Sequence, residues 1–333
     1  MSLTSPTTES PITAARPRVF KETEKAAFQA NYMRNPFQYS HNLKGHPLFE
    51  LPRLQTLANR ILDEHRTTKG VLWQNHNAPM DAKWSDIPKK MQMEKVGEAI
   101  ANLDKSGSWV LLYSVQSDPE YNALLTQIIE ELEEMVGPFQ QDMSIKDAYI
   151  FLGSPHSVTP YHIDHETTCL LQIHGNRTAN IWDRSVMPEN ELENYYLGFL
   201  SAAKYKEENL VKAHTYALNA GTGVHHPCCA PHAFKNGDTY SIALQINFFL
   251  RPLDVTSRIY QINGILRRLG MNPTPPGRSP GRDRAKIRAL GLFSKRNPKT
   301  KMEILRSGLH RLAFPVIWAH GVKKKIRDKK QKG

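Results

Sequence analysis

The stretch that most constrains this chain is residues 159–182, which contains the pair His162-x-Asp164. Successive side chains of a β-strand alternate between its two faces, so residues two apart point the same way. One neutral imidazole and one carboxylate can therefore reach a single cation from the same side. A second histidine would complete a set of two imidazoles and one carboxylate. That set leaves open coordination positions and suits non-haem Fe(II) that activates O₂.

The second histidine is expected on a later strand, within residues 220–238. Glycines in this segment allow a turn into a strand, and two prolines frame a tight corner that His232 directly follows. His225 and His226 precede the corner and are rivals, because sequence spacing cannot fix a contact between strands. The layout favours His232.

Around these motifs the chain changes from helical patterns to short strands at about residue 147. Strands are expected at 109–113, 148–152, 168–173, 178–182, 214–218 and 240–250, each bounded by turn-forming residues. Helices are expected at 20–33, from about 51, at 87–103, from 118 to a stop at Gly137, at 188–210 and at 255–269. Many short strands with sharp turns favour a β-barrel or sandwich with flanking helices.

The charge of the chain is divided sharply between its body and its tail. Residues 256–333 hold 21 lysines and arginines against 3 acidic residues, a net charge of +18, whereas residues 1–255 carry a net charge of −6. Only the tail is therefore a candidate for contact with an anionic membrane or a nucleic acid, and residues 282–333 are the segment expected to make it. Within it, residues 309–322 mix apolar and basic side chains next to a lysine run.

Cysteine usage and the N-terminus favour a reduced, cytoplasmic protein. Cys169, Cys228 and Cys229 are the three cysteines, and the adjacent pair cannot readily form an unstrained disulfide. Residues 1–18 are rich in Ser, Thr and Pro, which favours disorder, and they have no apolar signal-peptide core. No run of about 18 apolar residues predicts a membrane span.

Three segments carry a resemblance to a known family: TPYHIDHETTCLLQIHGNR (159–177), GVHHPCCAPHAFKNGD (223–238) and SIALQINF (241–248). Together with NPFQYSHNLKGHPLFELPRL (35–54), they resemble the bacterial jumonji-C and cupin-like Fe(II)- and 2-oxoglutarate-dependent oxygenases over about residues 36–250. The resemblance implies a mainly β fold with a double-stranded β-helix core at 105–255. A helical region at 19–104 would precede this core, and the basic helical tail, 256–333, lies outside the resemblance.

The resemblance also implies roles for single residues. His162, Asp164 and His232 would bind Fe(II). Arg177, fifteen positions after the first histidine, and Thr159, three before it, would hold the far carboxylate of 2-oxoglutarate, with Asn247 and Thr168 as further contacts to the co-substrate. Many family members have lysine where this chain has Arg177, but a guanidinium can also grip a carboxylate through two hydrogen bonds.

The expected function is therefore that of a 2-oxoglutarate-dependent dioxygenase, a hydroxylase of a protein side chain, a peptide or a small molecule. The first alternative is a cupin-like metal-binding sensor or scaffold without oxygenase activity. The second is a protein that associates with nucleic acid or membrane through its basic tail. The helix expected at 255–269 could form a homodimer or simply belong to the core, since Ile259, Ile262, Ile265, Leu266 and Leu269 recur along it at helical spacing.

Overall fold

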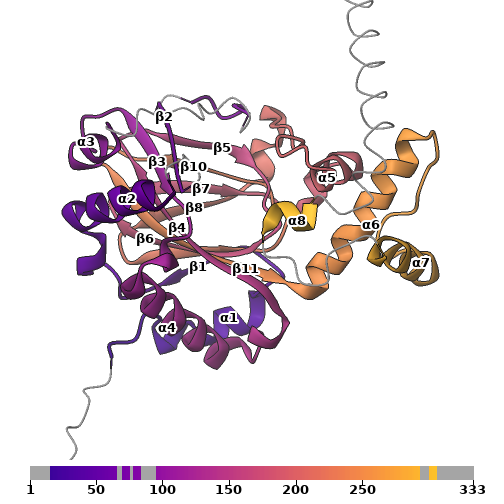
Figure 1. The fold of residues 1–333 in the computed structure, drawn as a ribbon, viewed down its shortest axis with the longest axis horizontal. Coiled ribbons are helices and arrows are strands. Elements are labelled where there is room, and N and C mark those ends of the chain that lie inside the picture. Colours follow the sequence, from indigo (N-terminus) through magenta and orange to yellow (C-terminus); the bar gives the residue numbers. More distant parts are fainter. Residues whose placement is uncertain (1–15, 66–69, 76–77, 84–94, 293–299, 306–333) are drawn as a thin grey trace, which may run out of the picture.

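The computed structural model describes residues 16–65, 70–75, 78–83, 95–292 and 300–305, which build two antiparallel β-sheets that face each other (Figure 1). The strands are β1 (Phe37–Ser40), β2 (Val71–Asn75), β3 (Ser108–Leu112), β4 (Met143–Gly153), β5 (Val158–His162), β6 (Thr167–His174), β7 (Asn176–Ile181), β8 (His214–Asn219), β9 (Thr222–His226), β10 (His232–Asn236) and β11 (Ser241–Leu250). The larger sheet has the order β1-β9-β6-β11-β4-β3-β2, and the smaller has the order β5-β10-β7-β8.

The chain crosses repeatedly between the two sheets from β4 onwards. Strands β4, β6, β9 and β11 lie in the larger sheet, and β5, β7, β8 and β10 lie in the smaller one. These eight strands form a double-stranded β-helix, as the family resemblance implied. Strand β11 is the centre of the larger sheet, paired along its length with β4 on one side and β6 on the other.

Side-chain alternation on the central strands divides the apolar residues into two cores. On β11, Ile242, Leu244 and Ile246 point outward into the main core, whereas Ala243 points into the space between the sheets. The inner cluster takes residues from both sheets, namely Phe151, Leu170, Ala179, Ile181, Leu218, Val224, Phe234 and Ala243, with Trp109, Leu111 and Ala230. One part of the barrel interior is therefore a packed apolar cluster.

Eight α-helices are present in the described part of the chain: α1 (Lys25–Asn31), α2 (Leu51–His65), α3 (Val96–Ala101), α4 (Pro119–Val136), α5 (Glu189–Tyr196), α6 (Arg251–Arg268), α7 (Pro280–Gly291) and α8 (Lys301–Leu305). Helices α1, α2 and α4 cover the outer face of the larger sheet, with apolar side chains in the main core. Asp118 caps α4 by accepting a hydrogen bond from the Glu120 amide, and Gly137 ends it with a positive φ of 92°.

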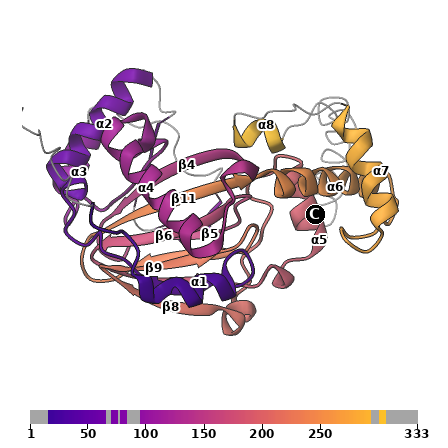
Figure 2. The same ribbon diagram turned by 90° about the horizontal axis from the view of Figure 1, so that it is seen from below.

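The helices that follow the strands gather at one end of the barrel. Figures 1 and 2 show α5, α6, α7 and α8 together at the end opposite α2 and α3. Helix α6 leaves β11 directly, beginning four residues earlier than the sequence predicted, and packs against α5, α7 and α8. Gln261 of α6 donates hydrogen bonds to the carbonyls of Ile304 and Leu305, which fixes α8 there.

Several predicted elements differ from the structure. The pattern over 188–210 gives a helix only at α5, followed by irregular chain and a 3₁₀ helix at Glu207–Lys212, because Gly198 takes a positive φ of 90° soon after α5 ends. The region expected to be helical, 19–104, also supplies β1 and β2 to the larger sheet. Of the segment 1–18 expected to be disordered, residues 1–15 lie outside the described residues, as do residues 87–94 of the helix expected at 87–103 and the tail beyond 305. Within the described residues, no helix is long and apolar enough to span a membrane.

Candidate metal and co-substrate site

Neighbouring strands of the smaller sheet place His162 and His232 side by side. His162 is the last residue of β5 and His232 is the first of β10, and the two are directly paired in register. Side chains at paired positions project from the same face, which brings the imidazole centroids to 4.1 Å. Strand β5 is an edge strand, so it can include Pro160, which has no amide proton for a neighbour.

Asp164 completes the group from just beyond the end of β5. Its Oδ2 atom lies 3.5 Å from His162 Nε2 and 3.6 Å from His232 Nε2. Ligand atoms of the three residues lie within 4.8 Å of one another. Strand alternation predicted that His162 and Asp164 would face the same way, but the structure brings them together differently. Strand β5 ends at His162, and the chain then turns so that the Asp164 carboxylate faces the imidazoles.

Both imidazoles are held in the orientation that a metal ion requires. His162 Nδ1 lies 2.8 Å from the carbonyl oxygen of Pro160, and His232 Nδ1 lies 2.9 Å from that of Ala230. A carbonyl can only accept, so each Nδ1 carries the proton and each Nε2 presents a lone pair. The two lone pairs and Asp164 Oδ2 converge on one point, and this donor set fits Fe(II) or a similar divalent cation.

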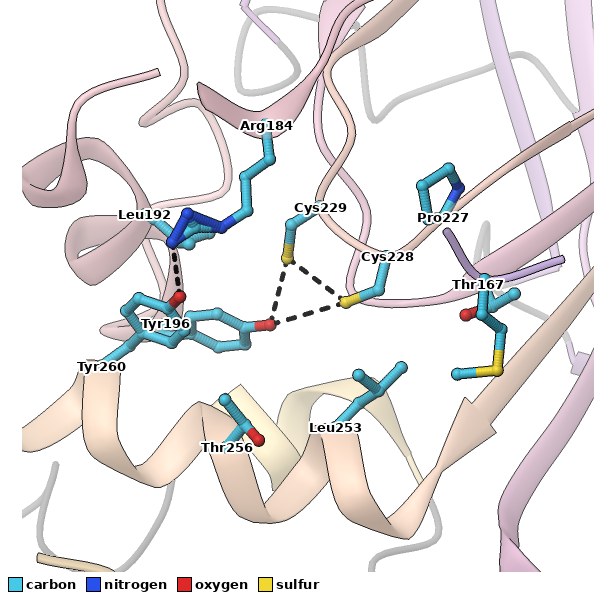
Figure 3. Close-up of a pocket in the computed structure, with 11 residues that line it drawn as sticks. Thr167, Arg184, Leu192, Tyr196, Pro227, Cys228, Cys229, Leu253, Thr256 and Tyr260 are labelled. Carbon is cyan, nitrogen blue, oxygen red and sulfur yellow. Dashed lines mark hydrogen bonds between the residues drawn. The ribbon is translucent and has the colours of Figure 1, made fainter. Parts of the chain in front are cut away.

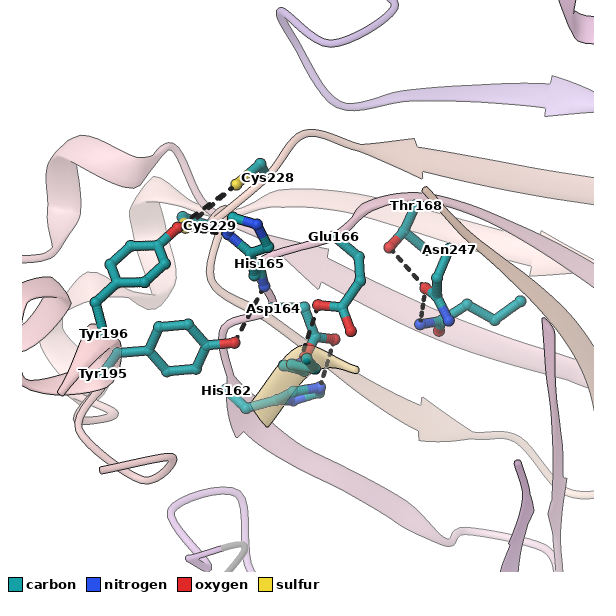
Figure 4. Close-up of polar contacts among 12 residues, drawn as sticks. His162, Asp164, His165, Glu166, Thr168, Tyr195, Tyr196, Cys228, Cys229 and Asn247 are labelled. Carbon is teal, nitrogen blue, oxygen red and sulfur yellow. Dashed lines mark hydrogen bonds and ion pairs between the residues drawn. The ribbon is translucent and has the colours of Figure 1, made fainter. Parts of the chain in front are cut away.

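A lysine from the distant helix α8 contacts the other oxygen of the same carboxylate. Lys301 Nζ lies 2.7 Å from Asp164 Oδ1 and 3.0 Å from Glu166 Oε2. Burial alone would raise the pKa of Asp164, but the Lys301 ammonium holds that pKa well below its usual value. Burial raises the pKa of Glu166, and Lys301 opposes that increase. Figure 4 shows Asp164 between His162 and Glu166.

The rival histidines lie outside the group that could hold a metal. His225 points out of the barrel, where its Nε2 accepts a hydrogen bond from the Met33 amide. His226 points inward and packs against His232, with the ring centroids 4.1 Å apart and the rings tilted by 32°. Both ring nitrogens of His226 lack a hydrogen-bond partner among the described residues. Burial lowers the pKa of His226 to about 4, so the ring is neutral and can contact a ligand in the interior.

Arg177 is a buried cation with no carboxylate partner in the described part of the chain. It lies on β7 opposite Asn236, four residues before the Ile181 that pairs with His232, so its side chain points to the same face as the metal-binding candidates. Only 5% of Arg177 is exposed, and its Nε and Nη2 atoms donate to the Ser241 hydroxyl at 3.2 and 2.9 Å. Burial lowers the pKa of its guanidinium to about 9. A buried charge of this kind needs an anion.

The remaining predicted co-substrate contacts also face the interior. The Thr159 hydroxyl accepts a hydrogen bond from Trp109 Nε1 at 3.0 Å, which leaves its own proton available for an acceptor. Thr168 and Asn247 are paired across β6 and β11, and the Thr168 hydroxyl donates to Asn247 Oδ1 at 3.1 Å. Asn247 Nδ2 has no partner among the described residues and remains a free donor (Figure 4).

Sequence reasoning did not identify several neighbours of the site, namely Trp109, Glu166, Ser241 and Lys301, and it considered His226 only as a rival metal ligand. Trp109 donates one hydrogen bond to Thr159, and Ser241 accepts two from Arg177, in both cases between strands that are distant in sequence. Glu166 stands two residues after Asp164, so the sequence already showed a second carboxylate next to the His-x-Asp pair. Nothing in the sequence pointed to Lys301, which lies in a segment rich in lysines.

Comparison with known proteins gives structural likeness without close sequence relatives. No protein-family model matches the chain, and no curated protein matches it. Among solved structures, the ribosomal oxygenase YcfD from Escherichia coli, in complex with cobalt and succinic acid, is similar at 14% identity. The match covers 85% of this chain and 73% of that one, with a TM-score of 0.47. The same protein solved with cobalt and 2-oxoglutarate gives 13% identity, the same coverages and a TM-score of 0.45.

A second, weaker likeness is to the lyase DddQ from Ruegeria pomeroyi, which acts on DMSP. It is 17% identical, with 32% of this chain and 39% of that chain covered and a TM-score of 0.22. At such values the assignment of the double-stranded β-helix rests on the strand order and register described above.

Proposed function

We propose that the protein is an Fe(II)- and 2-oxoglutarate-dependent oxygenase that hydroxylates a protein side chain, a peptide or a small molecule. The observation that carries this proposal is the joint presence, inside one barrel, of a His-Asp-His group and a buried guanidinium without an acidic partner among the described residues. The first could hold a divalent cation with open positions. The second calls for an anion at a fixed place on the same interior face.

The proposed roles follow from the positions of these side chains. His162, Asp164 and His232 would hold Fe(II). Arg177 would bind the far carboxylate of 2-oxoglutarate through two N–H groups, with the Thr159 hydroxyl as a further donor. Together the bound metal and keto acid would supply the oxidising chemistry that no side chain can provide.

The polar groups without partners support this assignment. Asn247 Nδ2 and both nitrogens of His226 are buried and lack hydrogen-bond partners among the described residues. Buried polar groups are normally paired, and each unpaired one costs about 1–3 kcal/mol. A polar co-substrate in the barrel could satisfy the donors that face it. The apolar residues around them would exclude water from the reacting atoms.

The competing proposal is a cupin-like metal-binding protein without oxygenase activity, a sensor or scaffold. Such a protein could use the same three metal ligands, but it would not need a buried arginine to bind the carboxylate of a co-substrate. Arg177 therefore favours the oxygenase.

Anaerobic titration of the apoprotein with Fe(II) and then 2-oxoglutarate tests the proposal. A chelated iron–keto-acid complex absorbs visible light, so we expect a new charge-transfer band that needs both additions. The band should weaken strongly in Arg177→Ala at the same 2-oxoglutarate concentration. Tight metal binding without any band would reject the oxygenase and favour the sensor or scaffold.

The basic tail supports a separate proposal, that residues 282–333 contact a polyanion. The net charge of +18 on residues 256–333 motivates it. Co-sedimentation with anionic vesicles and a salt-titrated RNA mobility shift would distinguish a membrane from a nucleic acid. Absence of binding in both assays at low salt would rule the proposal out. Formation of a homodimer through α6 likewise stays a prediction, testable by sedimentation.

A further inference from the structure

A second cluster of reactive side chains lies at the corner between β9 and β10, outside the proposed metal ligands. The corner is a turn in which the Ala230 amide donates to the carbonyl of Pro227 at 3.2 Å. Cys229, the third residue of this turn, has a φ of +60°, a conformation that favours glycine or asparagine. The Cys229 amide also donates to the carbonyl of Asp164 at 2.8 Å, which fixes the turn against the β5–β6 connection.

This turn directs two thiols toward each other. Cys228 Sγ lies 3.4 Å from Cys229 Sγ, and both cysteines are free. The phenolic oxygen of Tyr196 lies 3.2 Å from Cys229 Sγ and 4.0 Å from Cys228 Sγ. Two sulfurs and one oxygen therefore face a common point, as Figure 3 shows.

The Tyr196 oxygen is held in place by a chain of buried hydrogen bonds. Its hydroxyl lies 2.8 Å from His165 Nδ1, and His165 Nε2 lies 2.8 Å from Asp254 Oδ1. The carboxylate accepts the proton on Nε2, so Nδ1 accepts from the Tyr196 hydroxyl. The lone pairs of that oxygen are then left facing the thiols. The tyrosine ring is further fixed by stacking on Tyr260, with centroids 5.3 Å apart and an interplanar angle of 13°.

A pocket gives a ligand access to this cluster. It has a volume of about 180 Å³ and is lined by both cysteines, Tyr196, Arg184 and Tyr260, with Leu253 and Thr256 of α6 below (Figure 3). Cys228 is half-buried and Cys229 is buried, and both line the pocket. Arg184 donates to the Tyr260 hydroxyl at 2.6 Å and pairs with Glu189 at 2.8 Å, and is thus already engaged.

We propose that Cys228 and Cys229 form a chelating site for a thiophilic centre, a trivalent arsenical or a soft monovalent cation, with Tyr196 as an additional oxygen contact. Thiolates select soft ions over the hard ions that carboxylates and carbonyls prefer. With sulfur bonds of about 2.3 Å, a separation of 3.4 Å gives a bond angle of about 95° at the bound atom. Chelation therefore requires little movement of either sulfur, whereas a disulfide between adjacent residues would be strained.

The covalent step with an arsenical is balanced and involves no oxidation. Phenylarsine oxide, the probe, has one arsenic–oxygen group. Two S–H bonds break and two As–S bonds form, and the oxygen leaves with both protons as water. The arsenic remains trivalent, and no additional reactant is needed.

Titration of the full-length protein with phenylarsine oxide tests the proposal. We expect one arsenical per chain by intact mass and the loss of two thiols reactive toward a chromogenic disulfide. The adduct should resist an excess of a monothiol but be removed by 2,3-dimercaptopropanol, because only a dithiol can compete with a chelate. Absence of an adduct, or removal by the monothiol alone, would overturn the proposal.

Single substitutions identify the site. Cys228→Ser and Cys229→Ser should each weaken binding by at least tenfold, and Tyr196→Phe should weaken it less than either. Cys169→Ser is the matched control, since Cys169 is buried in the main core and should leave the adduct unchanged. Asp164→Ala should also leave it unchanged, which separates this site from the proposed metal centre. Equal binding by Cys228→Ser and the unaltered protein, with both folded by circular dichroism, would overturn chelation.

Discussion

The ammonium nitrogen of Lys301 lies 2.7 Å from Asp164 Oδ1, although 137 residues separate the two positions. The other carboxylate oxygen, Oδ2, faces both imidazole Nε2 atoms at 3.5 and 3.6 Å. The two oxygens of Asp164 are therefore divided between two tasks. One is available to a metal ion, and the other is held by a cation from the C-terminal part of the chain. Helix α8 is thus a structural part of the proposed metal site.

Replacement of Lys301 by methionine should weaken metal binding by about 10–100-fold, the usual effect of losing a group that orients a ligand. Without the ammonium, Asp164 can rotate, and Glu166 loses its only ion-pair partner in the described residues. Lys301→Arg should retain more affinity, because it preserves the positive charge. Anaerobic calorimetry with Fe(II), or with Co(II) as a stable substitute, measures the affinity directly.

Lys286→Met is the control for this experiment. Lys286 also belongs to the C-terminal part and pairs with an aspartate, Asp283, at 3.8 Å, but it has no contact with the metal site. Its replacement should leave metal affinity unchanged. If Lys301→Met instead bound metal more tightly than the unaltered protein, Lys301 would compete with the metal, and its assignment as a positioning residue would be wrong.

Replacement of Arg177 by leucine should have opposite effects on co-substrate binding and stability. Loss of two charge-assisted hydrogen bonds should weaken 2-oxoglutarate binding to the Fe(II) form by at least about 100-fold. Removing a buried charge with no acidic partner among the described residues should leave the free energy of unfolding of the apoprotein unchanged or raise it by about 1–3 kcal/mol. Calorimetry and urea denaturation would measure the two effects.

Arg184→Leu provides the contrast. Arg184 is paired with Glu189 and bonded to Tyr260, so its loss should destabilise the fold without affecting 2-oxoglutarate. A large loss of stability in Arg177→Leu, together with unaltered 2-oxoglutarate affinity, would mean that Arg177 is structural and would contradict its role as an anchor.

The strands of the barrel could largely be predicted, because turn residues punctuate them and their apolar content is high. Strand β5 was missed, since five residues that include Pro160 do not look like a strand. Strands β1 and β2 were missed because the pairings Phe37↔His225 and Val71↔Leu112 join segments that are distant in sequence. Local propensity has no information about such long-range register.

The residues of the site likewise divide into those that the sequence could predict and those that it could not. His162 and Asp164 are close in sequence, so their chemistry could be recognised, and the corner prolines marked His232. The Lys301 contact could not be predicted, because its position depends on how α6 carries the chain back over the barrel end and on two hydrogen bonds from Gln261. Because this part of the chain contains many lysines, the sequence alone does not distinguish Lys301 from the others.

Asp164→Ala should abolish tight Fe(II) binding and, with it, any turnover of 2-oxoglutarate. The variant removes the one carboxylate that faces both imidazoles and leaves the Lys301 ammonium beside them as an unfavourable charge. Asp238→Ala is the control, because Asp238 is exposed and its only ion pair in the described residues is with His156 at 3.7 Å. Turnover retained by Asp164→Ala would contradict the proposed ligand set.

The free energy of unfolding should depend on pH through His41, a buried histidine far from the site. Burial lowers the pKa of His41 to about 4 from its usual 6.5. The Leu43 amide donates to Nδ1 at 3.1 Å, and Nε2 donates to the Thr222 carbonyl at 3.1 Å, so the folded state requires the neutral ring. Between pH 6.5 and about pH 4, the imidazole of His41 is protonated in the unfolded chain but not in the folded protein. The contribution of His41 to stability is therefore complete above pH 6.5 and is lost as the pH falls toward 4.

His41→Gln should reduce this acid sensitivity, because an amide can donate and accept but does not titrate. Between pH 7.5 and pH 5.0, His41 should account for a loss of about 2 kcal/mol in the free energy of unfolding, from 1.36 kcal/mol for each pH unit below 6.5. Urea denaturation at both pH values gives the difference for each protein. The variant keeps the buried His225 and His226, so part of the acid sensitivity should remain. An unchanged difference in His41→Gln would mean that His41 keeps its ordinary pKa in the folded protein.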